Sequence, residues 1–421
     1  MTPSSVAASQ ARPPLAPCHW RVPIRPGLSQ RARHWHQPAA DREAPFGAAL
    51  CEFVTGFWSA QKAWAVAGTD SQIVRVTSVA ESPSSSRLAH IREYVAEVVG
   101  CAPDRVTTVS RFEDGNRHDV YRVSFLDAAG AAGDVVVRVS LGGDPAERGQ
   151  AEREAMVLET LGGVGAPQLL DFRSSSPRFG TPVMSMRFVP GPSFELSSAT
   201  SAEIERLGSV VATVHTRPVH DLADRFAETR TVGSYAEGRL QHILHGLPWA
   251  RDPLPPPLRD RVRHAASVIQ DGWDVWRDAE SFLTDETLSL LHGDIAVRNV
   301  LWGPDPVLID WEYARLGDPS DEIAYIFDQN GLAVPQREAF WRGYGARAGS
   351  GASFAHTMER VSWWEPLTLL GSTLWWVERW VRRAESKAAG TNDPAVPKDP
   401  GYYFDEATSR LDRLQRVIDP G

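Results

Sequence analysis

One short stretch constrains this chain more than any other: HGDIAVRNVLWGPDPVLIDWE, residues 292–312. Two apolar runs flank the loop GPDP, and this pattern predicts a β-hairpin with a four-residue connection. Pairing Trp302 with Val307 would place Asn299 opposite Asp310 at the open end of the hairpin, with their Cβ atoms about 5 Å apart. An amide and a carboxylate beside a buried strand pair indicate a functional site.

The chemistry of these side chains points to phosphoryl transfer. Amide and carboxylate oxygens suit Mg²⁺, which takes few protein ligands together with phosphate oxygens and water. Asp294 should lie at the same end of the hairpin, where its carboxylate could accept a proton from an attacking hydroxyl. Arg298 could contact a phosphate or the substrate, or it could form a surface salt bridge, and both readings stay open.

The order H-G-D-x-x-x-x-N, followed by I-D-W-E and G-D-P, resembles the aminoglycoside phosphotransferase and choline kinase superfamily over about residues 88–411. The resemblance implies an α+β, two-lobed, protein-kinase-like fold. It also implies Asp294 as catalytic base, Asn299 and Asp310 as Mg²⁺ ligands, and His292 as a structural histidine that braces the catalytic loop.

Two positions depart from the superfamily pattern. Ala296 stands where histidine is frequent, and Glu322 stands where aspartate is usual. Both departures leave the expected chemistry intact and concern how the catalytic loop is braced.

The periodicity predicts three segments. Residues 1–87 are rich in Pro, Ser, Ala and Arg and read as a mostly disordered extension, which also resembles a transit peptide. Residues 88–190 predict a small antiparallel sheet with one main helix at 145–161 that Asp144 caps and Gly162 ends. Residues 191–421 predict a larger, mostly helical lobe, in which the tryptophans of 361–383 belong to the core or line a groove. The resemblance implies that the first lobe binds the nucleotide and that the second carries catalysis and substrate binding.

The nucleotide side of the predicted site rests on fewer signals. Arg138 in VVVRVS takes the strand position of the phosphate-binding cation, and Glu154 lies about two turns into the following helix as its expected partner. Gly115 matches the superfamily's phosphate loop, and His118 is a further candidate for nucleotide binding. Acidic residues in the loop at 113–119 would repel phosphate unless Arg117 or His118 offsets them.

Composition narrows the functional class. No run of 18 apolar residues and no signal peptide appears, so we expect a cytoplasmic protein without membrane contact. Three separated cysteines fit neither a disulfide framework nor a zinc site. The net charge of −9, acidic mainly after residue 190, argues against nucleic acid as a partner. A monomer or homodimer is expected.

The predicted activity is transfer of the γ-phosphate of ATP or GTP, with Mg²⁺, to a hydroxyl of a small cationic molecule such as an aminoglycoside or related antibiotic. Glu312, Asp318 and Glu365 could contact such a cation. A resistance role follows from fold analogy alone. The alternatives are a kinase for an amino alcohol or sugar, a catalytically silent nucleotide-binding relative, or a protein kinase. The last lacks support, since only six residues separate Asp310 from Gly317 and no A-P-E follows.

Overall fold

The structure is a computed structural model that describes residues 85–419, except for 113–117, 220–221, 223–225, 227–230, 246–253, 278–287, 297, 350, 392–395 and 397. The expected disorder of residues 1–87 therefore falls almost wholly outside the described residues and stays a prediction. The same holds for the loop residue Gly115.

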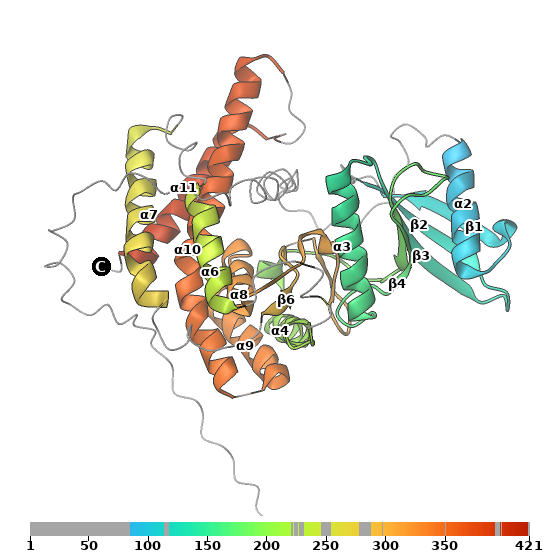
Figure 1. Cartoon of the computed structure of the whole chain (residues 1–421), viewed down its shortest axis with the longest axis horizontal. Helices are drawn as coiled ribbons and strands as arrows, with labels where there is room; N and C mark the ends of the chain where they lie inside the picture. The colour runs from blue at the N-terminus through green and yellow to red at the C-terminus, as the bar shows by residue number, and fades with distance from the viewer. Residues whose placement is uncertain are drawn as a thin grey trace, which may run out of the picture. The chain divides into compact units, whose positions relative to one another are not determined.

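A five-stranded antiparallel sheet dominates the first part of the described chain, with the strand order β1-β2-β3-β5-β4 (Figure 1). Its strands are β1 (Val106–Arg111), β2 (His118–Leu126), β3 (Ala132–Ser140), β4 (Leu169–Arg173) and β5 (Val183–Arg187). Alternation along β3 sends Val135, Val137 and Val139 to one buried face and Arg138 to the other. The two faces of the sheet therefore serve packing and chemistry separately.

One helix packs on each face of this sheet. Helix α2 (Ser85–Val99) buries Ile91, Tyr94 and Val95 against the valine face. Helix α3 (Pro145–Leu161) lies on the Arg138 face and begins and ends where the sequence predicts. The Asp144 side chain accepts the N–H of Glu147, and Gly162 ends the helix in the left-handed region with φ 58°. A short 3₁₀ turn, η2 (Pro103–Arg105), joins α2 to β1.

The remainder of the described chain is mainly helical. Its helices are α4 (Ser201–His215), α6 (Val232–His245), α7 (Pro256–Arg277), α8 (Pro319–Gln329), α9 (Val334–Ala348), α10 (Ala352–Ala388) and α11 (Pro400–Ile418), with the 3₁₀ turns η3 (Leu196–Ser198) and η5 (Trp311–Tyr313). Two short antiparallel pairs lie among them: β6 (Ser289–Leu291) with β9 (Arg315–Gly317), and β7 (Val300–Leu301) with β8 (Val307–Leu308).

Close helix contacts and buried aromatic side chains hold these helices together. Helices α4 and α9 meet at Gly208 and Gly343, where an added Cβ would lie 2.2 Å from the Phe340 carbonyl oxygen and 1.7 Å from that of Glu205. In α10, Trp364 and Trp376 are buried, as predicted for core residues. No helix in the described part of the chain is long and apolar enough to span a membrane.

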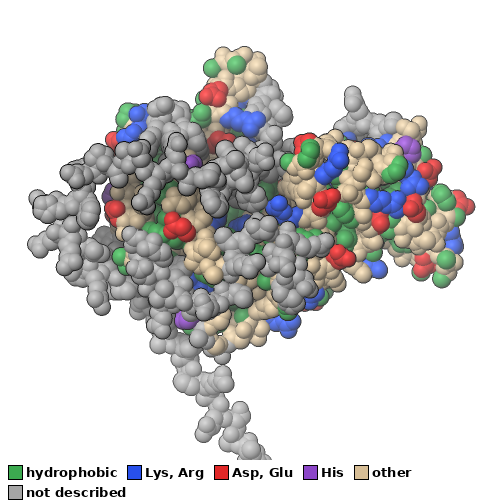
Figure 2. Space-filling model, viewed as in Figure 1, with side chains coloured by type: hydrophobic (Ala, Val, Ile, Leu, Met, Phe, Trp, Pro, Cys, Tyr) green, Lys and Arg blue, Asp and Glu red, His purple; other side chains and the backbone are tan. Residues whose placement is uncertain are grey.

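Charged side chains of both signs are interspersed over the five-stranded sheet on the face shown in Figure 2.

Candidate active site

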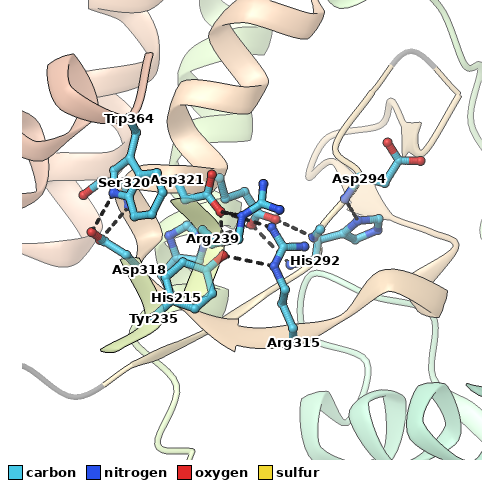
Figure 3. A network of polar contacts seen from close by, with 12 residues as sticks. His215, Tyr235, Arg239, His292, Asp294, Arg315, Asp318, Ser320, Asp321 and Trp364 are labelled. Atoms are coloured by element: carbon cyan, nitrogen blue, oxygen red, sulfur yellow. Dashed lines mark hydrogen bonds and ion pairs between the residues drawn. The ribbon is translucent and has the colours of Figure 1, made fainter. Parts of the chain in front are cut away.

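Buried side chains hold the loop between β6 and β7 in place. His292 is fully buried, and its Nε2 lies 2.9 Å from the carbonyl oxygen of Ile309, to which it donates. Its Nδ1 is then left to accept the backbone N–H of Asp294 at 3.2 Å (Figure 3). The ring thereby connects the loop to the residue that follows β8, which is the bracing role that the superfamily resemblance implies.

Glu322 of α8 holds the same loop by its main chain. Its carboxylate accepts the N–H of His292 at 3.2 Å and that of Gly293 at 2.5 Å. It also lies 2.9 Å from Nε2 of His215. Burial alone would raise the pKa of Glu322, but the hydrogen bonds that its carboxylate accepts, first from His215 and also from Gly293, hold the pKa below its ordinary value. Glu322, which stands where the superfamily usually has aspartate, therefore still braces the loop.

Asp294 projects from this loop with both carboxylate oxygens engaged. Oδ1 accepts the hydroxyl of Tyr325 at 2.6 Å, and Oδ2 accepts the Nδ2 amide of Asn299 at 3.0 Å. Burial raises the pKa of Asp294, with the Asp310 charge adding to it, while the bonds from Tyr325 and Asn299 offset part of the rise. A carboxylate with a raised pKa is suited to take a proton near neutral pH.

Asn299 is oriented by its amide nitrogen. Besides the Asp294 side chain, Nδ2 donates to the Asp294 backbone carbonyl at 2.8 Å. Both amide hydrogens are thus used on Asp294, which leaves the amide oxygen of Asn299 for another partner. An oxygen in that position suits a hard cation such as Mg²⁺.

The register predicted for the hairpin is wrong by one residue. Leu301 pairs with Val307 and Val300 with Leu308, so Asn299 lies opposite Ile309 rather than Asp310. The cause is Trp302, whose N–H donates to the Pro192 carbonyl at 2.9 Å and whose ring stacks on Phe194 at 5.1 Å between centroids. Because of these contacts, Trp302 does not pair with the opposite strand, and the loop that connects the two strands has five residues.

Asp310 leaves the strand in an unusual backbone conformation. Its φ of 68° makes it the one non-glycine residue with positive φ in the described part of the chain. Its side chain, 39% exposed, lies 3.5 Å from Nη1 of Arg138. A backbone held in this region at a polar residue is a frequent mark of functional sites.

Arg138 joins Asp310 to Glu154 across the sheet and α3. Arg138 and Glu154 are 9% and 2% exposed and form a buried ion pair. Although burial alone would lower the pKa of Arg138, the charges of Glu154 and Asp310 raise it, so the guanidinium stays charged. The structure thus joins the two residues that the sequence order predicts as partners.

A small pocket opens beside this pair. Its lining comprises His118, Arg138, Glu147, Gln150, Ala151, Glu154 and Glu312. Gln150 donates to the Glu312 carboxylate at 3.2 Å and so links α3 to η5. Asp119, at the end of the loop at 113–119, forms ion pairs with Arg87 and Arg111 at 2.9 and 2.6 Å. It therefore does not add to the charge of this pocket.

Other candidates lie elsewhere. Arg298 is exposed on the loop between β6 and β7 and does not line the pocket. Asp318, expected to contact a cation, is fully buried in a bidentate pair with Arg360 at 2.9 and 3.2 Å and accepts Nε1 of Trp364 at 2.8 Å (Figure 3). That expectation is wrong, because Asp318 caps α8 and anchors it to α10.

Sequence reasoning missed Tyr325. It lies in the apolar run EIAYIF, where helical spacing predicts only a core residue. The available signal was the spacing of Tyr325, whose polar hydroxyl follows Glu322 by three residues and so lies on the same helix face as that residue.

Oxygen ligands are few in this site. Among the described residues, no group of three or more His, Cys, Asp or Glu side chains is arranged to hold a metal ion. A metal held by Asn299 and Asp310 would take its remaining ligands from phosphate and water, and Mg²⁺ is commonly bound in this way.

The chain is similar to known proteins in sequence and in fold. The sequence profile of the phosphotransferase enzyme family matches residues 108–364. Mouse acyl-CoA dehydrogenase family member 10 is 22% identical over 250 residues, which are 56% of this chain and 21% of that protein. The chain thus spans about a fifth of the length of this relative.

Solved structures show the fold. The Plasmodium vivax ethanolamine kinase superposes with a TM-score of 0.53 at 12% identity, covering 81% of this chain and 90% of that one. A protein from Ralstonia eutropha assigned as an aminoglycoside phosphotransferase superposes with a TM-score of 0.52 at 13% identity, covering 77% and 98%. The predicted α+β, protein-kinase-like fold and the superfamily resemblance are confirmed.

Proposed function

Because this chain belongs to the phosphotransferase enzyme family, we propose that it is a kinase that transfers the γ-phosphate of ATP or GTP to a hydroxyl of a small molecule. The observation that carries the proposal is the Asp294 carboxylate, held on both oxygens by Tyr325 and Asn299. A binding module has no need to orient a carboxylate with a raised pKa at this place.

The nucleotide side of the proposed reaction is assigned to Arg138 and its surroundings. Arg138 remains charged beside Glu154 and lines the pocket together with His118, so it can bind a phosphate oxygen. Asn299 and Asp310 would hold Mg²⁺ through their side-chain oxygens. When bound, the ion would neutralise charge that develops on the phosphate oxygens.

The acceptor side is assigned to Asp294. Its carboxylate takes the proton of the acceptor hydroxyl as the oxygen–phosphorus bond forms, while the bond from the γ-phosphorus to the β–γ bridging oxygen breaks and ADP or GDP departs. The loop held by His292 and Glu322 keeps the base in place, so that orientation supplies most of the rate.

The acceptor class is proposed as a small hydroxyl compound, with aminoglycosides and amino alcohols as the first candidates. Of the three acids expected to contact a cation, Asp318 is unavailable, and Glu312 and Glu365 each already have a partner within the chain. Asp318 is buried, Glu312 accepts a hydrogen bond from Gln150, and Glu365 lies 3.3 Å from Arg337. Neutral sugars and anionic hydroxy compounds therefore belong in the same test.

The test is a coupled ADP-release assay on the full chain with ATP or GTP, with and without Mg²⁺. The panel holds aminoglycosides, macrolides, amino alcohols, sugars and hydroxy acids. Asp294→Asn is the control, because asparagine keeps an oxygen that accepts from Tyr325 but has no basic carboxylate. We expect Mg²⁺-dependent turnover with one acceptor class and a fall on the order of 10²–10⁴ in the control.

Undiminished turnover in Asp294→Asn would refute the assignment of the base. Nucleotide binding without any turnover across the panel would instead favour a silent relative.

A further inference from the structure

One face of helix α8 is directed at the catalytic loop. Glu322 and Tyr325 are three residues apart and thus neighbours on a helix surface. Glu322 accepts the main-chain N–H groups of His292 and Gly293, and Tyr325 donates to the side chain of Asp294. The same face therefore holds both the backbone of the loop and the side chain that it carries.

The start of α8 is itself immobilised. Asp318 caps the helix by accepting the N–H of Ser320 at 3.0 Å. Its two oxygens also bond to Arg360 and to Trp364 of α10. With its first turn tied to another helix inside the core, α8 presents Tyr325 from a fixed base.

The hydrogen bond from Tyr325 complements that from Asn299. The two donors come from different elements, α8 and the loop before β7, and each engages a different oxygen of Asp294. A carboxylate has about four lone-pair sites, so one site on each oxygen remains. Two donors on two oxygens fix the rotation of the carboxylate plane, which a single donor would leave free.

We propose that Tyr325 is a positioning residue of the phosphoryl-transfer site, whose hydroxyl holds the Asp294 carboxylate in the orientation that receives the acceptor proton. The inference rests on the proposed kinase function. Tyr325 keeps its own proton throughout, and the proton of the acceptor hydroxyl moves to Asp294. Burial and the adjacent Asp294 charge raise the pKa of Tyr325 well above its ordinary value, which agrees with a hydroxyl that only donates.

The test compares two substitutions of the same kind. Tyr325→Phe removes the hydroxyl at the loop. Tyr94→Phe removes a buried tyrosine hydroxyl that donates to Asp171 at 2.9 Å from helix α2, on the valine face of the sheet. Both variants lose one tyrosine–carboxylate hydrogen bond, but only the first loses it at Asp294. Thermal unfolding of each variant records any loss of folded protein.

The first readout is the crystal structure of each full-chain protein. We expect a single Asp294 orientation in wild type and Tyr94→Phe, and a rotated or multiple orientation in Tyr325→Phe. This readout needs no acceptor, so it stands even if the proposed kinase function fails. An Asp294 carboxylate that keeps its single orientation in Tyr325→Phe overturns the proposal.

The second readout is kinetic and uses the acceptor that gives the highest turnover in the ADP-release panel. Tyr325→Phe should lower kcat roughly 10- to 100-fold, the effect of losing a hydrogen bond to a charged group, and leave KM for ATP unchanged within about twofold. Tyr94→Phe should leave both constants near wild type. An equal fall in kcat in the two variants, or none in Tyr325→Phe, overturns the proposal.

Discussion

The carboxylate of Glu322 accepts the backbone N–H of Gly293 at 2.5 Å, so a helix side chain holds the catalytic loop by its main chain. The same carboxylate accepts the backbone N–H of His292 and lies 2.9 Å from Nε2 of His215. Glu322, His292 and His215 are buried, where an unpaired donor is costly.

Glu322→Ala should lower the free energy of unfolding by about 3–5 kcal/mol, because the substitution leaves several buried donors without their acceptor. Urea denaturation at neutral pH measures the loss. Glu205→Ala is the matched control, since the Glu205 carboxylate also has a side-chain partner, Arg342 at 3.2 Å, but both side chains are about half exposed. It should cost less than about 1 kcal/mol. Similar losses in the two variants would contradict a bracing role for Glu322.

Local signals account for what the sequence predicted well. Helix α3 follows from Asp144 at its start and Gly162 at its end, both of which act through neighbouring backbone groups. The strands of the five-stranded sheet follow from their alternation. Arg138 and Glu154 could be expected to meet because one strand and the following helix carry them.

Long-range packing accounts for what the sequence did not predict. The hairpin register depends on Trp302, which does not pair with the opposite strand. Its contacts are instead with the Pro192 carbonyl and the Phe194 ring, more than a hundred residues earlier in the chain. The contact of Tyr325 with Asp294 depends on how α8 docks below the loop, and helical spacing does not say which side chain on a buried face meets which partner. The burial of Asp318 likewise follows from Arg360, which lies in another helix.

Arg138→Met should destabilise the fold by about 3–5 kcal/mol, because Glu154 would remain buried without its partner. The double variant Arg138→Met, Glu154→Leu should recover most of that loss, since an apolar pair can replace a buried ion pair at little cost.

Nucleotide affinity should not recover in the double variant. Calorimetric titration with ATP should show binding weakened roughly 10- to 100-fold in both variants, because neither has a cation at this place. Recovery of ATP affinity in the double variant would contradict the assignment of Arg138 to phosphate binding.

Asp310→Asn should separate the backbone role of this residue from its charge. Asparagine tolerates the left-handed region that Asp310 occupies at φ 68°, so the fold should remain as stable as in wild type. Turnover should fall by on the order of 10²–10³, with a higher Mg²⁺ concentration needed for half of the maximal rate. Asp305→Asn, the same change at an exposed position in the connection of the same hairpin, is the control. Mg²⁺ titration of the ADP-release rate measures both, and identical curves for Asp310→Asn and wild type would contradict a role for the Asp310 charge in metal binding.

Asp321 should make the stability of the fold depend on pH in acid. It accepts the hydroxyl of Tyr235 and lies 3.2 and 3.3 Å from Arg239 and Arg315 (Figure 3). Burial alone would raise the pKa of Asp321, but the charges of Arg239 and Arg315 and the hydrogen bonds hold it below its ordinary value. A carboxyl group with a lower pKa in the folded than in the unfolded state stabilises the fold fully above its unfolded value, about pH 4, and loses that contribution as pH falls through the folded value. The difference in unfolding free energy between wild type and Asp321→Asn, measured with urea at several pH values, should therefore be constant from pH 7 to about 5 and shrink below about 4. A difference that begins to shrink near pH 6 would show that the pKa of Asp321 in the folded protein is not lowered.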